Sequence, residues 1–156
     1  MISARADCGQ DYLRGKLEYA NSTLPYLSVV VGEIVRLALE HRSIRQRLEQ
    51  LDVHRQLTGG DEVYSSELQS VERMADELCG RINQCYLELD GVEGITFSAE
   101  LPDTIEFPFE FENGIVHLSW RLGEEKVSHW HWSDESDDSR RSCETLMEIA
   151  LQSQEH

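Results

Sequence analysis

The chain has 156 residues, enough for one domain with a real core, because a domain of this size buries roughly two thirds of its unfolded surface. It carries 30 acidic against 14 basic residues, a formal net charge of −16. Such a charge repels phosphate backbones and anionic lipid surfaces. We therefore expect no nucleic-acid partner and no membrane partner.

Cysteine usage and the apolar runs indicate a compartment. The four cysteines form no CxxC pair, and the N-terminus lacks the charged and then apolar segments of a signal peptide. The longest apolar run, YLSVVVGEIV, is short and is interrupted by Gly32 and Glu33. These features predict a soluble cytoplasmic protein with reduced thiols and no membrane span.

Two stretches have helical periodicity, over residues 17–58 and 61–90. Spacings of three and four residues put one apolar stripe on each predicted helix. In the first helix the stripe comprises Leu24, Leu27, Val31, Ile34, Ala38, His41, Ile44, Leu48 and Leu51. In the second it comprises Tyr64, Leu68, Val71, Ala75, Leu78, Ile82, Cys85 and Leu89.

The two stripes need partners, and the LTGGDE segment between them supplies a turn. Gly59 and Gly60 suit a helix end, and Asp61 suits the cap of the next helix. The sequence thus predicts an antiparallel, coiled-coil-like helical hairpin. His41 lies in the first stripe, where a packed histidine is the ordinary interpretation and a ligand the alternative.

Proline is typical of the first turn of a helix. Pro25 therefore predicts that the long helix begins close to this residue. The preceding segment KLEYANSTL is then expected to form a separate turn.

Between residues 104 and 132 the periodicity changes to two, which predicts a three-stranded antiparallel meander. The first strand turns Ile105, Phe107, Phe109 and Phe111 toward the core. The second strand does so with Val116, Leu118, Trp120 and Leu122. A tight Asn113-Gly114 turn is expected to pair Phe111 with Val116 and Glu110 with His117.

An acidic loop over residues 133–142 and a C-terminal helix over 143–153 follow, the helix capped by Asp137, Asp138 or Ser139. The predicted fold is thus a single α+β domain over residues 1–156. In it a long helical hairpin packs on the small meander, with a short C-terminal helix added.

The stretch VSHWHW, residues 127–132, has two open interpretations, because a one-residue change of register exchanges the faces of a strand. A loop of two or four residues at Gly123 puts Val127, His129 and His131 on the core face. A loop of three residues puts Trp130 and Trp132 there instead.

In the second register His117, His129 and His131 gather on the outer face beside Glu106 or Glu110. Imidazoles with a carboxylate can hold a divalent metal ion and polarise a bound water molecule. The alternative is an ordinary polar sheet face. The clustered tryptophans are expected in the core, or else at a partner surface.

Several motifs together resemble an uncharacterised bacterial family, domain of unknown function 2203, over roughly Leu17–Arg141. They are the entry LEYANSTLPYL, the strand IEFPFEFE, the hairpin VHLSWRLGE and the pair WH. The resemblance supports fold and compartment and implies a shared site. The matching positions for that site are Glu106, Arg121, Glu124, His131 and Arg140.

The family pattern carries no assigned activity, so the function and whether the chain is an enzyme stay open. The long apolar stripes and the lack of a catalytic signature favour a protein-interaction module, forming a homo-oligomer or binding another protein. The competing hypothesis is a metal-assisted hydrolase or small-ligand binder that uses His131 with Glu124 or Glu106.

Overall fold

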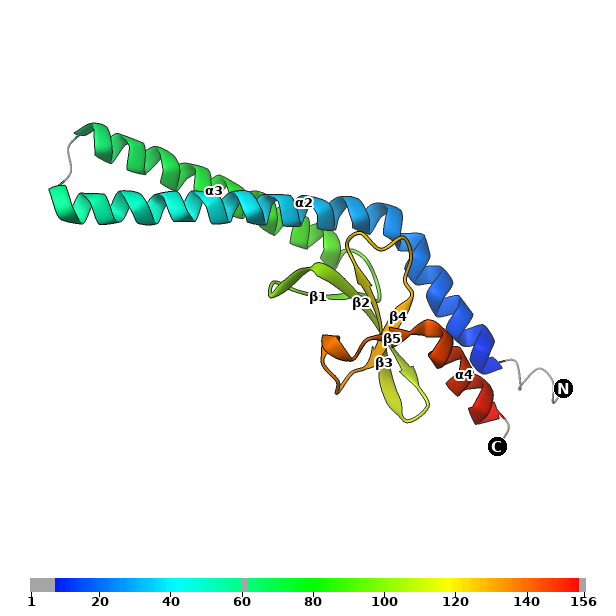
Figure 1. Ribbon diagram of the computed structural model, residues 1–156. Helices are drawn as coiled ribbons and strands as arrows, with labels where there is room; N and C mark the ends of the chain where they lie inside the picture. The colour runs from blue at the N-terminus through cyan, green and yellow to red at the C-terminus, as the bar shows by residue number, and fades with distance from the viewer. Residues whose placement is uncertain (1–7, 60–61, 155–156) are drawn as a thin grey trace. The chain divides into compact units, whose positions relative to one another are not determined.

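The computed structural model describes residues 8–59 and 62–154 (Figure 1). They form two compact units: residues 8–29 with 92–154 make unit 1, and Val30–Gly91 makes unit 2. In chain order the elements are α2 (Cys8–Thr58), α3 (Glu62–Asp90), β1 (Thr96–Ser98), β2 (Leu101–Phe111), β3 (Gly114–Arg121), β4 (His129–Trp132), the 3-10 helix η1 (Asp137–Ser139), β5 (Arg141–Ser142) and α4 (Cys143–Gln154). The predicted α+β class is confirmed.

Unit 2 consists of the second part of α2 and the whole of α3, which run antiparallel (Figure 1). The predicted stripe of α3 is its buried side: Ala75, Leu78, Cys85 and Leu89 are buried, and Leu68, Val71 and Ile82 are half-buried. In α2, Val31, Ile34 and Leu51 are buried, while Ala38, His41, Ile44 and Leu48 are half-buried. Burial of these apolar side chains holds the helices together.

Polar contacts between the helices flank this apolar layer. Arg81 pairs with Glu33 at 3.2 Å, and Arg47 pairs with Glu67. His41, a candidate ligand in the sequence, lies with its Nε2 3.2 Å from the Cys79 sulfur. Gly59 ends α2 with a φ of +79°, which suits glycine, whereas Gly60, Asp61 and the Tyr64 side chain lie outside the described residues.

The sheet of unit 1 has five antiparallel strands in the order β1-β2-β3-β4-β5, so the prediction of three strands was incomplete. The meander β2-β3-β4 is present, but β1 and β5 extend it at the two edges. They have only three and two residues. Strands this short leave no alternating pattern in the sequence, since their pairing depends on distant residues.

The β2–β3 hairpin has a different register from the predicted one. Phe109 lies opposite Val116 and Phe111 lies opposite Gly114, so Glu112 and Asn113 form the turn. Glu112 takes the positive φ, +57°. Because the register differs by two residues, the faces are as expected: Ile105, Phe107, Phe109, Phe111, Val116, Leu118 and Trp120 are all buried.

The β3–β4 pairing resolves the two open registers in favour of the second. Leu118 lies opposite Trp130, and His117 lies opposite His131. Trp130 is buried, whereas Trp132 is half-buried. The loop is longer than three residues, since it spans residues 122–128, but it is also odd in length and so gives the same faces. Val127 is buried within this loop, where its N–H donates to Asn21 Oδ1.

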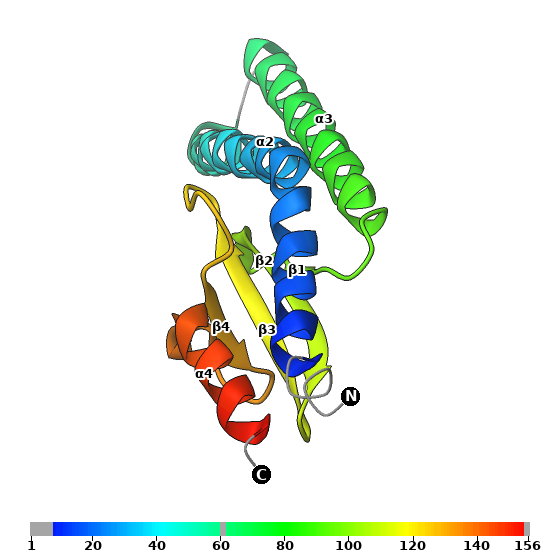
Figure 2. The ribbon, with the colours of Figure 1, turned by 90° about the vertical axis from the view of Figure 1, so that its right-hand side faces the viewer.

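Helices cover the apolar face of the sheet in unit 1 (Figure 2). The Tyr12 ring meets Phe109 edge-on at 5.8 Å, and Leu13 and Ala20 on the same helical segment are buried. From α4, Thr145 accepts a hydrogen bond from the Trp130 indole at 2.9 Å. The segment expected to form a separate turn is thus a regular part of α2, and in unit 1 it covers the sheet.

Pro25 lies inside α2 rather than at its start. Proline cannot donate a backbone hydrogen bond, so the helix tolerates one lost bond there. Leu24 and Leu27, which precede and follow Pro25 in the sequence, are both buried, and their packing offsets the lost bond. The start of α4 also differs from the expected cap: Ser142, not residues 137–139, accepts the Glu144 amide at 3.3 Å.

By length and composition alone, α2 contains a window that is apolar enough to cross a membrane. This is weak evidence, because a core helix in a globular protein passes the same test, and 33% of the window is buried. The absence of a membrane span therefore stays a prediction.

Candidate functional site: a polar face of the sheet

The face of the sheet opposite the apolar one carries most of the residues singled out in the sequence. The alternation of β2, β3 and β4 turns Glu106, His117, Ser119 and His131 to this face. The segment of residues 133–140 folds back over it, because Asp137 contacts both Ser119 and Arg121. As a result Ser119 and His131 are buried although they lie on the polar side.

Glu106, His117 and His131 form the first cluster, which we call the His-Glu triad. One nitrogen or oxygen from each residue lies within 4.8 Å of the others. The two imidazole rings stack with centroids 5.3 Å apart, as expected for directly opposed residues on β3 and β4. The His131 side chain is 5% exposed, His117 19% and Glu106 25%, so the triad opens to solvent on one side.

The hydrogen bonds of His131 fix its ring nitrogens. Nδ1 lies 2.8 Å from the Trp132 carbonyl oxygen, which can only accept, so Nδ1 carries a hydrogen. Nε2 contacts Glu106 Oε2 closely. In a neutral imidazole this Nε2 offers a lone pair to a carboxylate that also offers lone pairs. A proton or a cation must therefore lie between them.

His117 adds an unsatisfied group to the same point. Its Nδ1 is buried, has no hydrogen-bond partner within the described part of the chain, and lies 3.6 Å from Glu106 Oε2. Leaving a buried polar atom unpaired is costly. Three possible ligand atoms thus converge, and one of them has no other partner.

These distances are close to those of a tetrahedral zinc site. Bonds of about 2.0 to 2.2 Å to zinc separate neighbouring ligand atoms by roughly 3.3 Å. The His117–Glu106 distance of 3.6 Å agrees with this spacing. Glu106 and His131 are closer, so the half-exposed Glu106 carboxylate must rotate away slightly to admit an ion.

Arg121, Glu124 and Arg140 form a second cluster, which we call the arginine cluster. Glu124 Oε1 accepts hydrogen bonds from Arg140 Nη2 and from the Arg121 amide, both at 2.7 Å. Arg140 Nε also donates to Ser119 Oγ at 3.1 Å, and the Arg121 guanidinium pairs with Asp137. Each charged group of this cluster is thus paired with an opposite charge. Because Asp137 and Arg140 belong to residues 133–140, these ion pairs hold that segment, which we call the covering segment, against the sheet.

Electrostatics within the arginine cluster follow from these bonds. Burial raises the pKa of the Glu124 carboxyl, but the hydrogen bonds from Arg140 and the Arg121 amide outweigh it, and the pKa falls below its ordinary value. His129 Nδ1 lies 3.4 Å from Glu124 Oε2. This candidate metal ligand therefore belongs to the arginine cluster and not to the His-Glu triad.

The five residues of the expected shared site are thus divided between two neighbouring clusters. Glu106 and His131 are in the triad, and Arg121, Glu124 and Arg140 are in the arginine cluster. Ser119 connects them, since it lies opposite Glu106 in the sheet and binds Arg140.

Sequence reasoning missed the roles of Ser119 and Asp137. Ser119 could have been found, because it alternates with His117 and Arg121 on one strand. Asp137 begins the 3-10 helix η1, which has only three residues and is too short to leave a periodic pattern in the sequence.

Comparison with known proteins agrees with the motifs in the sequence. The model of the family described as "Uncharacterized conserved protein (DUF2203)" matches residues 16–143, which include both clusters. No match was found among curated proteins or among solved structures. The match covers most of the chain and confirms the resemblance seen in its motifs, and the chain belongs to the DUF2203 family.

Proposed function

We propose that this protein binds one divalent transition-metal ion through Glu106, His117 and His131. The observation that carries the proposal is the convergence of three possible ligand atoms within 4.8 Å, one of them a buried and unpaired imidazole nitrogen. Imidazole and carboxylate ligands suit Zn²⁺, Fe²⁺ and Co²⁺ better than Mg²⁺ or Ca²⁺. The Trp132 carbonyl supports His131 as a ligand, because it leaves the Nε2 lone pair for the ion.

Three protein ligands leave at least one coordination position for water or a substrate. A metal ion in this position lowers the pKa of bound water and polarises a substrate oxygen. The open side of the triad gives access to that position, since His117 and Glu106 are partly exposed. The reaction class that these features support best is metal-assisted hydrolysis.

Metal analysis of untagged protein tests the proposal. After exposure to zinc and extensive dialysis, we expect about one ion per chain in the native protein and loss of that ion in His117→Ala, His131→Ala and Glu106→Gln. His129→Ala is the matched control, because it removes a histidine from the same face outside the triad. Equal metal content in all five proteins would contradict the proposal.

Substitution with Co²⁺ provides a second measurement. Four-coordinate Co²⁺ with nitrogen and oxygen ligands absorbs visible light much more strongly than hydrated Co²⁺. We expect this absorption in native protein and in His129→Ala but not in Glu106→Gln. A spectrum of hydrated cobalt in the native protein would contradict the proposal.

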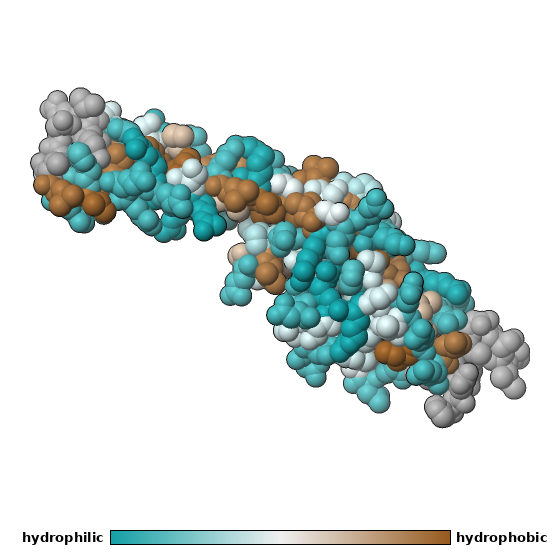
Figure 3. All heavy atoms as spheres, in the orientation of Figure 1, coloured by the Kyte–Doolittle hydropathy of each residue, from teal (hydrophilic) through white to brown (hydrophobic). Residues whose placement is uncertain are grey.

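A second candidate function, self-association through unit 2, is supported by exposed apolar side chains. Leu39 and Val53 are 61% and 54% exposed and lie two heptads apart on one face of α2, and Leu57, on the same face, is 81% exposed. Figure 3 shows apolar residues of unit 2, in brown, at the molecular surface. A second copy of the chain would bury this stripe.

Sedimentation velocity over micromolar concentrations tests self-association. We expect a dimer that dissociates in Leu39→Glu and Val53→Glu, since each puts a charge into an apolar contact. Gln56→Glu adds the same charge on a flank of the helix and is expected to leave the dimer intact. A native protein that is monomeric throughout would contradict this function and leave the metal proposal unaffected.

A further inference from the structure

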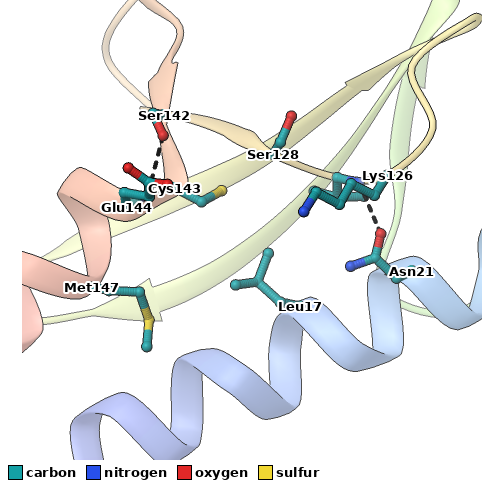
Figure 4. A pocket seen from close by; sticks show the side chains of 9 residues that line it. Leu17, Asn21, Lys126, Ser128, Ser142, Cys143, Glu144 and Met147 are labelled. Carbon is teal, nitrogen blue, oxygen red and sulfur yellow. Dashed lines mark hydrogen bonds between the residues drawn. The ribbon is translucent and has the colours of Figure 1, made fainter.

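A cleft in unit 1 lies on the helix-covered side of the sheet, apart from the residues of the His-Glu triad. It has a volume of about 330 Å³ and is formed by the first part of α2, residues 126–128 and the start of α4 (Figure 4). Ligand pockets range from roughly 300 to 1,000 Å³, so this one has room for a small molecule.

Hydrogen bonds between the three segments hold the walls of the cleft in place. Asn21 Oδ1 accepts the Val127 amide at 2.8 Å, which ties the loop to α2. The Cys143 amide donates to the Ser128 carbonyl at 2.9 Å, which ties the loop to α4. A site whose walls are fixed beforehand loses less entropy when it binds a ligand.

Most of the exposed lining surface of the cleft is apolar, although Ser128, Ser142 and Glu144 also line it. Glu144 lies at the end opposite Lys126 (Figure 4). Leu17 of α2 and Met147 of α4 extend into the space between the helices, and the Cys143 sulfur faces the same opening (Figure 4). Burial raises the pKa of the Cys143 thiol to about 11, so its sulfur is uncharged at neutral pH. These side chains fit an aliphatic or aromatic group.

Two polar groups lie at the loop end of the cleft. Lys126 is one of only two lysines in the chain, and within residues 8–59 and 62–154 it makes no ion pair. The Asn21 carbonyl oxygen is occupied by Val127, which leaves its amide nitrogen as a donor on the cleft side (Figure 4). An ammonium and an amide N–H together suit a carboxylate.

We propose that this cleft binds a small amphiphile that carries one carboxylate on a short apolar tail. The carboxylate lies at Lys126 and Asn21, and the tail lies between Leu17 and Met147. The net charge of −16 disfavours ligands with several negative charges, such as nucleotides, whereas one local cation suffices for a monoanion. The proposal is independent of the metal site, whose ligands do not line the cleft.

Methyl NMR of the methionines, with sodium octanoate as the probe, tests the proposal. Met147 lines the cleft, and Met74 is an internal control because it is exposed on α3. We expect octanoate to shift the Met147 methyl signal saturably at a 1:1 ratio and to leave Met74 unchanged. Addition of EDTA is expected to have no effect on this binding.

Substitution of the two lysines tests the position of the carboxylate. Lys126→Gln is expected to weaken octanoate binding about twofold to fivefold, the range for an exposed ion pair, and to leave binding of neutral 1-octanol unchanged. Lys16→Gln removes the other lysine and is expected to change neither. No saturable shift of Met147 at millimolar octanoate, or equal shifts of Met74, would overturn the site. Unchanged octanoate affinity in Lys126→Gln would overturn the role of the carboxylate.

Discussion

At the residue scale, the covering segment depends on the contacts of Glu135. Its Oε1 accepts hydrogen bonds from Arg141 Nη1 at 2.8 Å and from the Trp132 amide at 2.9 Å. The Arg141 guanidinium also stacks over the Trp130 ring at 5.0 Å. One half-buried carboxylate therefore connects the end of β4 to the start of β5.

These bonds predict the acid titration of Glu135. The hydrogen bonds from Arg141, with a smaller effect of the Trp132 amide, lower the pKa of Glu135 from 4.5 to about 2. A lowered pKa stabilises the fold above pH 4.5, and this contribution is lost as the pH falls from 4.5 toward 2. NMR of the carboxyl carbon is expected to give a midpoint near 2 in native protein. In Arg141→Gln the midpoint is expected to rise toward 4.5 but to stay below it, because the Trp132 amide still donates to Glu135. Arg42→Gln, in unit 2, is expected to leave the midpoint unchanged.

The cysteines differ in their reactivity for a similar physical reason. Cys143 is buried, which raises the pKa of its thiol from 9.0 to about 11, whereas Cys79 is exposed. Since the thiolate is the nucleophile, we expect iodoacetamide at pH 8 to modify Cys79 much faster than Cys143.

Peptide mass spectrometry measures both cysteines in one sample. The protonated Cys143 thiol stabilises the fold below pH 9, and this stabilisation is lost between pH 9 and 11. Labelling of Cys143 is therefore expected to increase over that interval. Equal labelling of the two cysteines at pH 8 would show that the cleft wall opens readily.

At the scale of elements, the stripe of α3 can be tested by truncation. Leu78 is 6% exposed in the buried stripe, so Leu78→Ala is expected to lower the free energy of unfolding by about 2 to 5 kcal/mol. Leu87 lies on the same helix but is 62% exposed, and Leu87→Ala is the matched control with little expected loss. Urea denaturation measures both, and similar losses would show that the stripe is not the packed side of α3.

The same stripes explain why the helices were predictable from sequence. A spacing of three and four residues that is kept over many residues fits a helix and not a strand. In α3 each member of the stripe with a described side chain is indeed buried or half-buried. The start of α2 was not predictable in this way. Pro25 has the local signature of a helix start, and only contacts such as that of Tyr12 with Phe109 override it.

The site was only partly predictable, because alternation within a strand is visible in the sequence whereas the register between strands is not. Alternation within a strand put His117 and His131 on one face once the register was known. The register itself depends on a seven-residue loop, whose length no sequence rule fixes. The pairing of His129 with Glu124 depends on the course of that loop, and so it could not be predicted either.

At the scale of the whole molecule, the dominant property is the net charge of −16. Like charges on a compact chain repel one another, and salt screens this repulsion. We therefore expect the urea midpoint to rise between 10 mM and 500 mM sodium chloride. A lower midpoint at high salt would mean that ion pairs such as Arg36–Glu33 outweigh the repulsion.

Unit 2 is inserted in the chain between the two parts of unit 1, and this arrangement has a consequence for folding. Unit 1 requires contacts between residues far apart in sequence, such as Asn21 with Val127, whereas unit 2 forms from two consecutive helices. Contacts near in sequence form faster than distant ones. Once the helices of unit 2 pair, Val29 and Val92 are no longer separated by a free chain, and the entropy cost of closing unit 1 falls. We therefore expect the helices of unit 2 to pair first and, by shortening the loop that must close, to speed the assembly of the sheet.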